Sequence, residues 1–220
     1  MSEYTGNLDK IDTVLFDFDG TLVKISIDFA EMKRMVLLLG EEYGVSPGQD
    51  LYVLESVEDI FISLMRRDEA IADAFKCQAE EIIVNIEMEA AENSIMFPGA
   101  DNVLKELKNR GIKTAIVTRN CKKAVVRASE MAGFIYDLLL TRDDVQKVKP
   151  DPVHLLDALN LLNSNPKRAI MVGDQPMDII AGKKAGMKTA AVLTVRPKDD
   201  FMDISPDIIF DDVSGILDVI

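Results

Sequence analysis

Short apolar runs, each followed by a polar residue with useful chemistry, recur along the chain. Three of them are 14–16, 115–117 and 169–173, which lead into Asp17, Thr118 and Asp174. They hold large or β-branched side chains without apolar–polar alternation, as is typical of strands buried on both faces of a parallel sheet. Further runs at 138–140, 189–193 and 208–210 bring the prediction to about six strands.

Helical patterns lie between these runs. Segment 101–110 places its leucines on one face, and Gly111 follows as a left-handed stop. Asp151 and Pro152 are typical of an N-cap and a first-turn proline, and a further helix is expected from Pro176 to Gly186. Alternating strands and helices predict an α/β fold with a doubly wound, Rossmann-like parallel sheet. Ligands of such sheets bind beyond the carboxyl ends of the strands.

One long stretch breaks the alternation. Patterns with a helical period cover 29–39, 53–65 and 70–91, and no convincing strand lies among them. We therefore expect an inserted all-helical cap at 24–95, with 1–23 and 96–220 forming the α/β core. The sequence Phe97-Pro98-Gly99 marks the return to the core, because proline and glycine interrupt regular structure.

Charge and cysteine content narrow the function classes. The 25 Lys and Arg residues against 38 Asp and Glu residues give a net charge of −13, which disfavours nucleic-acid and anionic-membrane partners. Cys77 and Cys121 are too far apart for a CxxC site, and we interpret them as free thiols in a reducing compartment. Residues 1–10 are polar, and no apolar run is long enough to cross a bilayer. We expect a cytoplasmic protein, either monomer or dimer.

Acidic residues stand where two of the expected strands end. Asp17 and Asp19, two positions apart in an extended segment, project to one side about 7 Å apart. One carboxylate can then attack a phosphorus atom while the other reaches the leaving oxygen. Lys149 and a magnesium ion would neutralise the phosphate, since Mg²⁺ prefers oxygen ligands such as carboxylates. The sequence therefore predicts a phosphate-and-metal site.

Four segments together resemble, in order, the motifs of the haloacid dehalogenase superfamily. They are Asp17-Phe18-Asp19-Gly20-Thr21, Thr118 after a strand, Lys149-Pro150-Asp151-Pro152, and Gly173-Asp174-Gln175-Pro176-Met177-Asp178. Any one of them would be weak, whereas all four in order are specific. The nearest branch is phosphoglycolate phosphatase-like, and the insertion is similar to that branch's small helical cap.

This resemblance implies a role for each site residue. Asp17 is expected to be the nucleophile and Asp19 the general acid/base. The phosphate-binding residues are expected to be Thr118, Lys149, Gly20 and Asn120. The magnesium ligands are expected to be Asp17, Asp19 through its backbone carbonyl, Asp174 and Asp178. Many relatives have Thr-Asn at the second motif, whereas Arg119 intervenes here, so either Arg119 or Asn120 contacts the substrate.

Asp178 and the single histidine, His154, have simpler structural interpretations. Asp178 would also suit the first turn of a helix without any metal, because an acid there favours the helix dipole. His154, the only histidine, lies early in the helix after Pro152. We interpret it as a surface or packing residue.

The function implied is a magnesium-dependent phosphatase that hydrolyses a small phosphomonoester through an aspartyl-phosphate. Its substrate would be a phosphoglycolate-like compound or a sugar or nucleotide phosphate. The enzymatic alternative is a sugar-phosphate mutase of the beta-phosphoglucomutase type, which also keeps both aspartates. A non-catalytic binding module on the same fold is a third interpretation, disfavoured by the intact motifs.

Overall fold

The computed structural model describes residues 11–46 and 51–220. The described residues form two compact units, one made of 11–25 and 94–220 and the other of 26–93 without 47–50. The division falls after Ile25 and before Ser94, close to the expected boundaries at 23/24 and 95/96. The polar segment 1–10 lies outside the described residues.

The first unit is built on a six-stranded sheet in the order β5-β4-β1-β6-β7-β8, in which all neighbours are parallel. The strands are β1 (Thr13–Phe16), β4 (Lys113–Val117), β5 (Leu138–Leu140), β6 (Ala169–Gly173), β7 (Lys188–Val192) and β8 (Ile208–Phe210). The doubly wound parallel sheet is thus confirmed, with each strand at its expected place.

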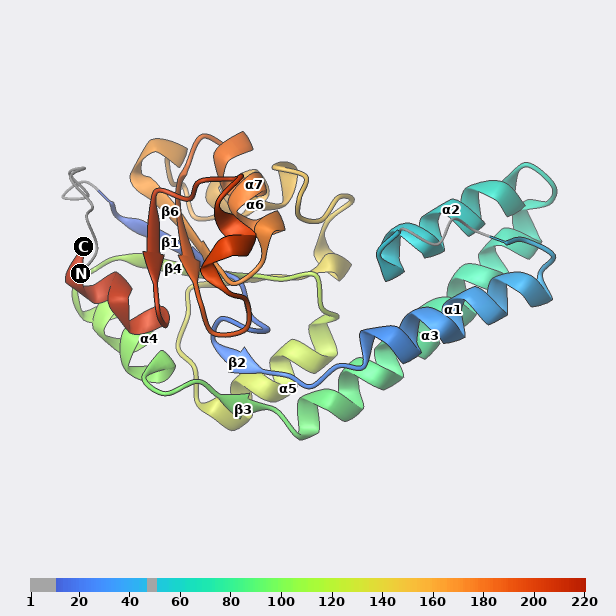
Figure 1. Cartoon of the computed structure of the whole chain (residues 1–220), viewed down its shortest axis with the longest axis horizontal. Helices are drawn as coiled ribbons and strands as arrows, with labels where there is room; N and C mark the ends of the chain where they lie inside the picture. The colour runs from blue at the N-terminus through green and yellow to red at the C-terminus, as the bar shows by residue number, and fades with distance from the viewer. Residues whose placement is uncertain (1–10, 47–50) are drawn as a thin grey trace. The chain divides into compact units, whose positions relative to one another are not determined.

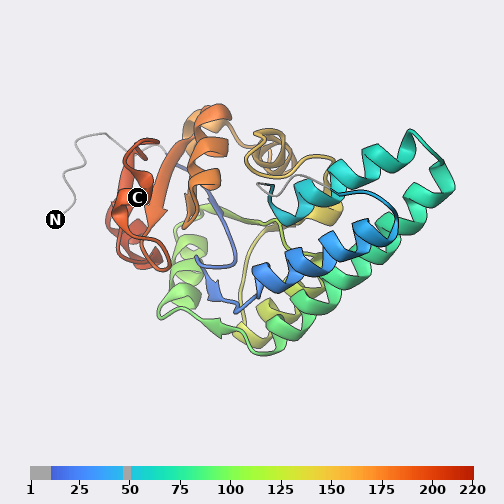
Figure 2. The same ribbon diagram turned by 45° about the vertical axis from the view of Figure 1, so that its right-hand side comes forward.

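Helices cover both faces of this sheet. They are α4 (Ala100–Asn109), α5 (Lys122–Ala132), α6 (Val153–Leu161) and α7 (Pro176–Lys184). Figures 1 and 2 show α6 and α7 on one face and α4 and α5 on the other. Short 3₁₀ turns complete the unit: η1 (Arg142–Asp144), η2 (Pro166–Arg168), η3 (Lys198–Phe201) and η4 (Val213–Asp218).

Burial on both faces explains the unbroken apolar character of β1. Val14, Leu15 and Phe16 are all fully buried. Leu15 packs in a cluster with side chains of α6 and α7, and because strand side chains alternate, Val14 and Phe16 face the other helical layer. Burying each such side chain contributes about 1.5–3 kcal/mol, so β1 is a rigid base for the residue that follows it.

The topology of the sheet places Asp17 at its topological switch point, which we also call its turning point. β1 lies between β4 and β6, and the strands continue outward to β5 on one side and to β7 and β8 on the other. The strand order therefore reverses at β1, the position where doubly wound sheets bind their ligands.

The start of α6 and the end of α4 can be compared with the predicted helix ends. Helix α6 begins at Val153, and Oδ1 of Asp151 accepts a hydrogen bond from the Val153 N–H at 3.0 Å. The N-cap is Pro152 and not Asp151 as expected, so the helix begins one residue later, although the Asp151 carboxylate still accepts the N–H of its first residue. Gly111 follows α4 with φ of +71°, a left-handed conformation that glycine adopts without strain.

The second unit consists of three helices, α1 (Phe29–Glu42), α2 (Val53–Met65) and α3 (Glu69–Glu92). Their apolar faces pack into one cluster that includes Met32, Ile60 and Phe75. Asp28 and Asp68 cap α1 and α3 by accepting backbone N–H groups. The expected all-helical insertion is thus present; α1 and α3 extend slightly beyond the predicted segments, and α2 has the predicted bounds.

The sequence did not predict a short antiparallel β-ribbon. β2 (Val23–Lys24) pairs antiparallel with β3 (Ile95–Met96), and both views show the two strands side by side where the chain leaves and re-enters the first unit (Figure 1). Strands of two residues are too short to show a period, so no pattern could predict them. No helix among the described residues is long and apolar enough to cross a membrane.

Candidate active site

Parallel register brings the polar strand-end residues to one edge. Phe16 pairs with Ile116 of β4 and with Val172 of β6. The residues after these strands, Thr118 and Asp174, therefore meet Asp17 at the carboxyl edge of the sheet. Backbone contacts extend the ladder, since the Asp17 N–H donates to the carbonyl of Val172 at 2.9 Å.

Lys149 joins this edge through two buried ion pairs. Its Nζ lies 2.8 Å from Oδ1 of Asp17 and 2.7 Å from Oδ1 of Asp178. The Lys149 side chain is 1% exposed. Burial alone would lower the pKa of Lys149, but the two carboxylates outweigh it and the pKa is raised. Lys149 is therefore a fixed positive charge beside Asp17.

Three carboxylates converge beside this ammonium group. Asp17, Asp174 and Asp178 each offer an oxygen, and these oxygens lie within 4.8 Å of one another. Burial, and then the charges of Asp17, Asp178 and Asp19, raise the pKa of Asp174 to about 8. Burial likewise raises the pKa of Asp178 to about 6, against the opposing effect of Lys149.

This donor set fits a hard divalent cation. When all three carboxyl groups are deprotonated, they exceed the one ammonium group by two negative charges, and every offered ligand is an oxygen. Mg²⁺ is typically held by a few carboxylates together with water and substrate oxygens. The side chains of Asp17, Asp174 and Asp178 are thus the residues that could hold it.

Two glycines leave room for the carboxylates. A Cβ at Gly20 would lie 2.3 Å from Oδ2 of Asp174, and one at Gly173 would lie 2.3 Å from Oδ2 of Asp178. Gly20 also has φ of +84°. Its N–H donates to the carbonyl of Val23 at 2.8 Å, so the phosphate-binding role expected of Gly20 stays a prediction. In the structure, the absence of a side chain at Gly20 makes room for the carboxylate of Asp174.

Asp19 does not belong to the cluster of Asp17, Asp174 and Asp178. Its Oδ1 accepts a hydrogen bond at 2.9 Å from the backbone N–H of Ile25, the last residue of the first segment of this unit. Asp19 is partly exposed. Its expected roles, acid/base catalysis and metal binding through its backbone carbonyl, stay predictions.

Asp178 caps a helix and also pairs with Lys149, while its expected role as a magnesium ligand stays a prediction. Its Oδ2 accepts the backbone N–H of Gln175 at 3.0 Å, which caps the first turn of α7. Its Oδ1 pairs with Lys149. The helix-cap interpretation is therefore correct but incomplete, because the same carboxyl group also faces the charged cluster.

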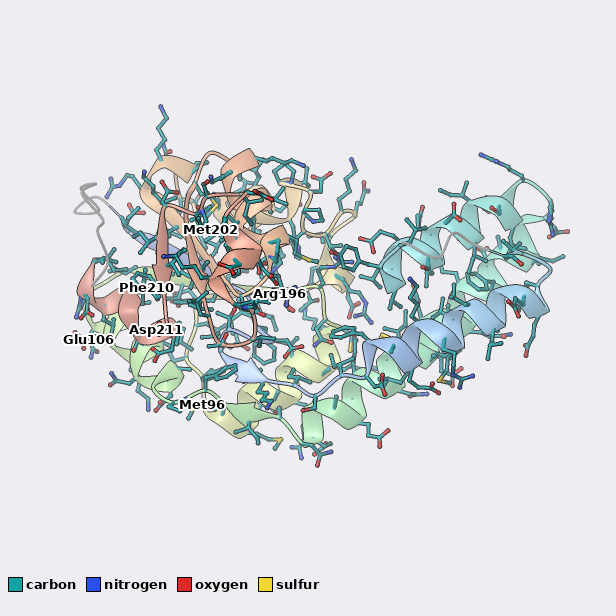
Figure 3. The ribbon with its side chains drawn as sticks, viewed as in Figure 1. Met96, Glu106, Arg196, Met202, Phe210 and Asp211 are labelled. Atoms are coloured by element: carbon teal, nitrogen blue, oxygen red, sulfur yellow. The ribbon has the colours of Figure 1, made fainter. Side chains whose placement is uncertain are left out.

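A chain of hydrogen bonds that sequence reasoning missed holds Asp174. Nε2 of Gln175 donates to Oδ2 of Asp174 at 2.9 Å, and Nε of Arg196 donates to Oε1 of Gln175 at 2.7 Å. Arg196 lies in the loop after β7 and is labelled in Figure 3. Its place beyond the carboxyl end of a strand was the available signal. Such outer contacts orient a metal ligand.

The second-motif loop holds two buried polar residues. Thr118 is 2% exposed and Asn120 is 6% exposed. Oγ1 of Thr118 accepts the Asn120 N–H at 3.2 Å. Within the described part of the chain, Oδ1 of Asn120 finds no hydrogen-bond partner. This buried oxygen of Asn120 can therefore accept a further hydrogen bond. The expected phosphate-binding roles of Thr118 and Asn120 stay predictions.

Arg119 is partly exposed. Its Nη1 lies 3.2 Å from Sδ of Met177, while its carbonyl accepts a hydrogen bond from Nη1 of Arg142 at 3.1 Å.

His154 packs inside the fold beneath Lys149. It is fully buried, and its Nδ1 accepts the backbone N–H of Lys149 at 3.3 Å. Burial, followed by the charge of Lys149, lowers the pKa of His154 to about 3. His154 is therefore a neutral packing residue, one of the two possibilities expected.

The chain is similar to known proteins over most of its length. The family model described as haloacid dehalogenase-like hydrolase matches residues 14–192. The protein named pyrophosphatase PpaX of Bacillus cereus strain Q1 is 31% identical over 220 residues, covering 96% of this chain and 97% of its own length.

Two solved structures share the fold. A haloacid dehalogenase-like hydrolase from Bacteroides fragilis has a TM-score of 0.70 at 24% identity, covering 94% of this chain and 100% of its own. A predicted phosphoglycolate phosphatase from Haemophilus somnus has a TM-score of 0.63 at 21% identity, covering 96% and 98%. These structures show the fold. The family match and the sequence relative show that this chain belongs to the haloacid dehalogenase-like hydrolase family and is a phosphatase-type hydrolase of that family.

Proposed function

We propose that this protein is a magnesium-dependent phosphatase that acts on a small phosphorylated metabolite through an aspartyl-phosphate at Asp17. The observation that carries the proposal is the 2.8 Å contact between Nζ of Lys149 and Oδ1 of Asp17 at the turning point of the sheet. A buried cation beside this carboxylate attracts a phosphate dianion toward it.

In the first step, a carboxylate oxygen of Asp17 attacks the phosphorus atom and the bond to the leaving oxygen breaks. Asp19 gives its proton to the leaving oxygen, which departs as an alcohol. Lys149 stabilises the negative charge on the phosphoryl oxygens, and the Thr118 hydroxyl is close enough to the strand end to donate to one of them. The product of this step is an aspartyl-phosphate.

In the second step, the Asp19 carboxylate takes a proton from water while the water oxygen attacks the phosphorus atom. The bond between phosphorus and Asp17 breaks, so inorganic phosphate leaves and both carboxyl groups return to their starting states. Asp17, Asp174 and Asp178 would hold magnesium through their carboxylates, and Asp19 through its backbone carbonyl. Magnesium, when bound, neutralises negative charge on the transferring phosphoryl group.

The net charge of −13 disfavours nucleic acid and an anionic membrane as partners. A small phosphorylated metabolite would have to bind at local cations such as Lys149 and magnesium. The free Cys77 and Cys121 support a cytoplasmic location. The name of the Bacillus cereus relative adds inorganic pyrophosphate to the phosphoglycolate-like, sugar and nucleotide phosphates as substrates to test.

The test is phosphate release from about a hundred phosphorylated metabolites with magnesium present, with Asp17→Asn as the blank. The proposal expects release from at least one of them and none from the variant. Conversion of a sugar 1-phosphate into its 6-phosphate without phosphate release would replace the phosphatase with the mutase alternative. No turnover of any compound, including p-nitrophenyl phosphate, would favour a binding module.

A further inference from the structure

The loop after β7 contacts two residues that border Asp174. The hydroxyl of Thr194 donates to the carbonyl of Gly20, the glycine that makes room for the Asp174 carboxylate. Nε of Arg196 donates to Oε1 of Gln175 at 2.7 Å, and Gln175 follows Asp174 in the chain. One loop therefore supports two neighbours of a carboxylate that belongs to the acidic cluster.

Both oxygens of the Asp174 carboxylate accept hydrogen bonds. Oγ1 of Thr21 donates to Oδ1 at 3.3 Å, and Nε2 of Gln175 donates to Oδ2 at 2.9 Å. Asp174 is also fully buried. A buried carboxylate with a donor on each oxygen has little freedom to rotate, so it offers a metal ion a rigid ligand.

Arg196 determines which end of the Gln175 amide faces Asp174. A side-chain amide has an acceptor end, Oε1, and a donor end, Nε2. A guanidinium can only donate, so Oε1 faces Arg196 and Nε2 is left for the carboxylate. The reversed amide would lose both hydrogen bonds and place its oxygen against Oδ2 of Asp174. Asp200 in η3 holds Arg196 in turn, with Oδ2 at 2.9 Å from Nη1.

A rigid carboxylate has different consequences for two hard cations. Mg²⁺ is small and demands near-ideal octahedral geometry. Ca²⁺ accepts a larger and more variable number of oxygens, including both oxygens of one carboxylate. A fixed Asp174 whose two oxygens already accept hydrogen bonds therefore suits magnesium better than calcium.

We propose that Arg196 is a positioning residue that acts through Gln175 to hold Asp174, and that it thereby makes the cluster of Asp17, Asp174 and Asp178 select magnesium over calcium. This inference rests on the metal site of the proposed function, and it deepens it by assigning the choice of metal to a residue outside the four motifs. The charge of Arg196 acts in the opposite direction. If only that charge mattered, removing it would strengthen the binding of every divalent cation.

The test titrates the metal-free protein with Mg²⁺ or Ca²⁺ at pH 8 and constant ionic strength, and it follows the melting temperature, which needs no substrate. Arg196→Met should raise the Kd for magnesium about 10- to 100-fold, the usual effect of losing an outer contact to a metal ligand. The Kd for calcium should rise much less, because calcium tolerates a mobile ligand. Arg196→Lys can still donate to Oε1 of Gln175 and should keep part of the selectivity.

A second substitution tests the route through Gln175. Gln175→Met removes the amide and should itself weaken magnesium binding. In that background Arg196→Met should add no further loss, because the contact that Arg196 supports is already gone. A full additional loss would show that Arg196 acts by another route and would overturn the proposal.

Arg110→Met is the matched control. Arg110 and Arg196 each pair with an acid four positions away at 2.9 Å, and their side chains are 36% and 40% exposed. Arg110 precedes β4 and so lies at the amino end of that strand, whereas Asp174 follows the carboxyl end of β6. Its loss should leave both Kd values unchanged. Unchanged or tighter magnesium binding in Arg196→Met would overturn the proposal, as would equal weakening for the two ions.

Turnover separates this inference from the proposed function. At saturating magnesium, Arg196→Met should recover most of the wild-type kcat, because excess metal compensates for weak binding. Selective magnesium binding by a protein that turns over no phosphate compound would contradict the proposed function alone. A wild type that binds neither ion, or that binds calcium as tightly as magnesium, would overturn the inference.

Discussion

Nζ of Lys149 lies 2.8 Å from Oδ1 of Asp17, although the two residues are 132 positions apart in the chain. Lys149 also pairs with Asp178, and both its partners are buried. Removing the ammonium would leave their carboxyl groups without their shared cation inside the fold. The stability of the core and the reactivity of Asp17 are thus tied to one side chain.

We expect Lys149→Met to lower the free energy of unfolding by about 3–5 kcal/mol, the usual cost of removing one partner of a buried ion pair. Turnover should fall below detection as well. Urea unfolding and a phosphatase assay measure the two effects, and Lys149→Arg, which keeps the charge, is the control for stability. A Lys149→Met protein with wild-type turnover would refute the role of this cation.

Asp19→Asn should distinguish the role of Asp19 from that of Asp17 in the first motif. If Asp19 protonates the leaving oxygen, its loss matters most for a poor leaving group. We expect the phosphoryl-transfer step to slow by about 10²-fold or more with an alkyl phosphate and less with p-nitrophenyl phosphate. The burst phase must be measured, because Asp19 also serves the second step. Equal slowing of both bursts would move the acid/base role to another residue.

Metal binding should depend on pH in a defined direction. The pKa values of Asp174 and Asp178, about 8 and about 6, lie above the ordinary value of 3.8. The folded metal-free protein therefore holds extra protons, and these two groups make it less stable as the pH rises from about 4 to about 8. Because a cation needs the deprotonated carboxylates, magnesium should raise the melting temperature more at pH 8 than at pH 6.

The measurement is a thermal melt with EDTA or with magnesium at matched ionic strength, at both pH values. Asp174→Asn should remove most of the magnesium effect at pH 8. EDTA should abolish turnover, and added magnesium should restore it. Full turnover after thorough chelation would mean that the carboxylate cluster serves structure alone.

His154 should make the fold sensitive to mild acid. Its pKa of about 3 lies below the ordinary value of 6.5, so in the range between them the unfolded chain binds a proton that the folded chain refuses. The stability that this neutral histidine contributes is complete above pH 6.5 and is lost as the pH falls toward 3. At pH 5 the loss is about 2 kcal/mol.

His154→Gln tests this, because an amide oxygen can still accept the backbone N–H of Lys149. The loss of unfolding free energy between pH 7 and pH 5 should be about 2 kcal/mol smaller in the variant than in the wild type. Comparing the two proteins cancels the opposing contributions of Asp174 and Asp178. Identical pH dependence would show that His154 is protonated in the fold at pH 5.

The sequence predicted most of the fold because burial leaves a pattern. Residues 14–16 are apolar without alternation because both faces of β1 are covered. The helices of 26–93 could be predicted because each buries one apolar face in a single cluster. The ribbon of β2 and β3 could not be predicted, since two residues per strand carry no period.

The candidate site was predictable in part. Asp17, Thr118 and Asp174 follow buried strands, so strand register alone brings them together. Lys149 lies in a loop without an apolar pattern, so its role was predicted from the need to neutralise a phosphate and from the resemblance to the family's third motif. The contact between Gln175 and Arg196 joins residues 21 positions apart through side chains, and no local pattern encodes such a pairing.

The central claim is that Asp17 carries the phosphoryl group during turnover. The most direct measurement is acid quenching of the wild type during turnover of a good substrate with magnesium, followed by mass spectrometry of the peptide that contains Asp17. We predict one added phosphoryl group on Asp17 that disappears when the substrate is exhausted, and none on Asp17→Asn. An unmodified peptide in a wild type that is turning over, or an Asp17→Asn protein that retains turnover, would contradict the account.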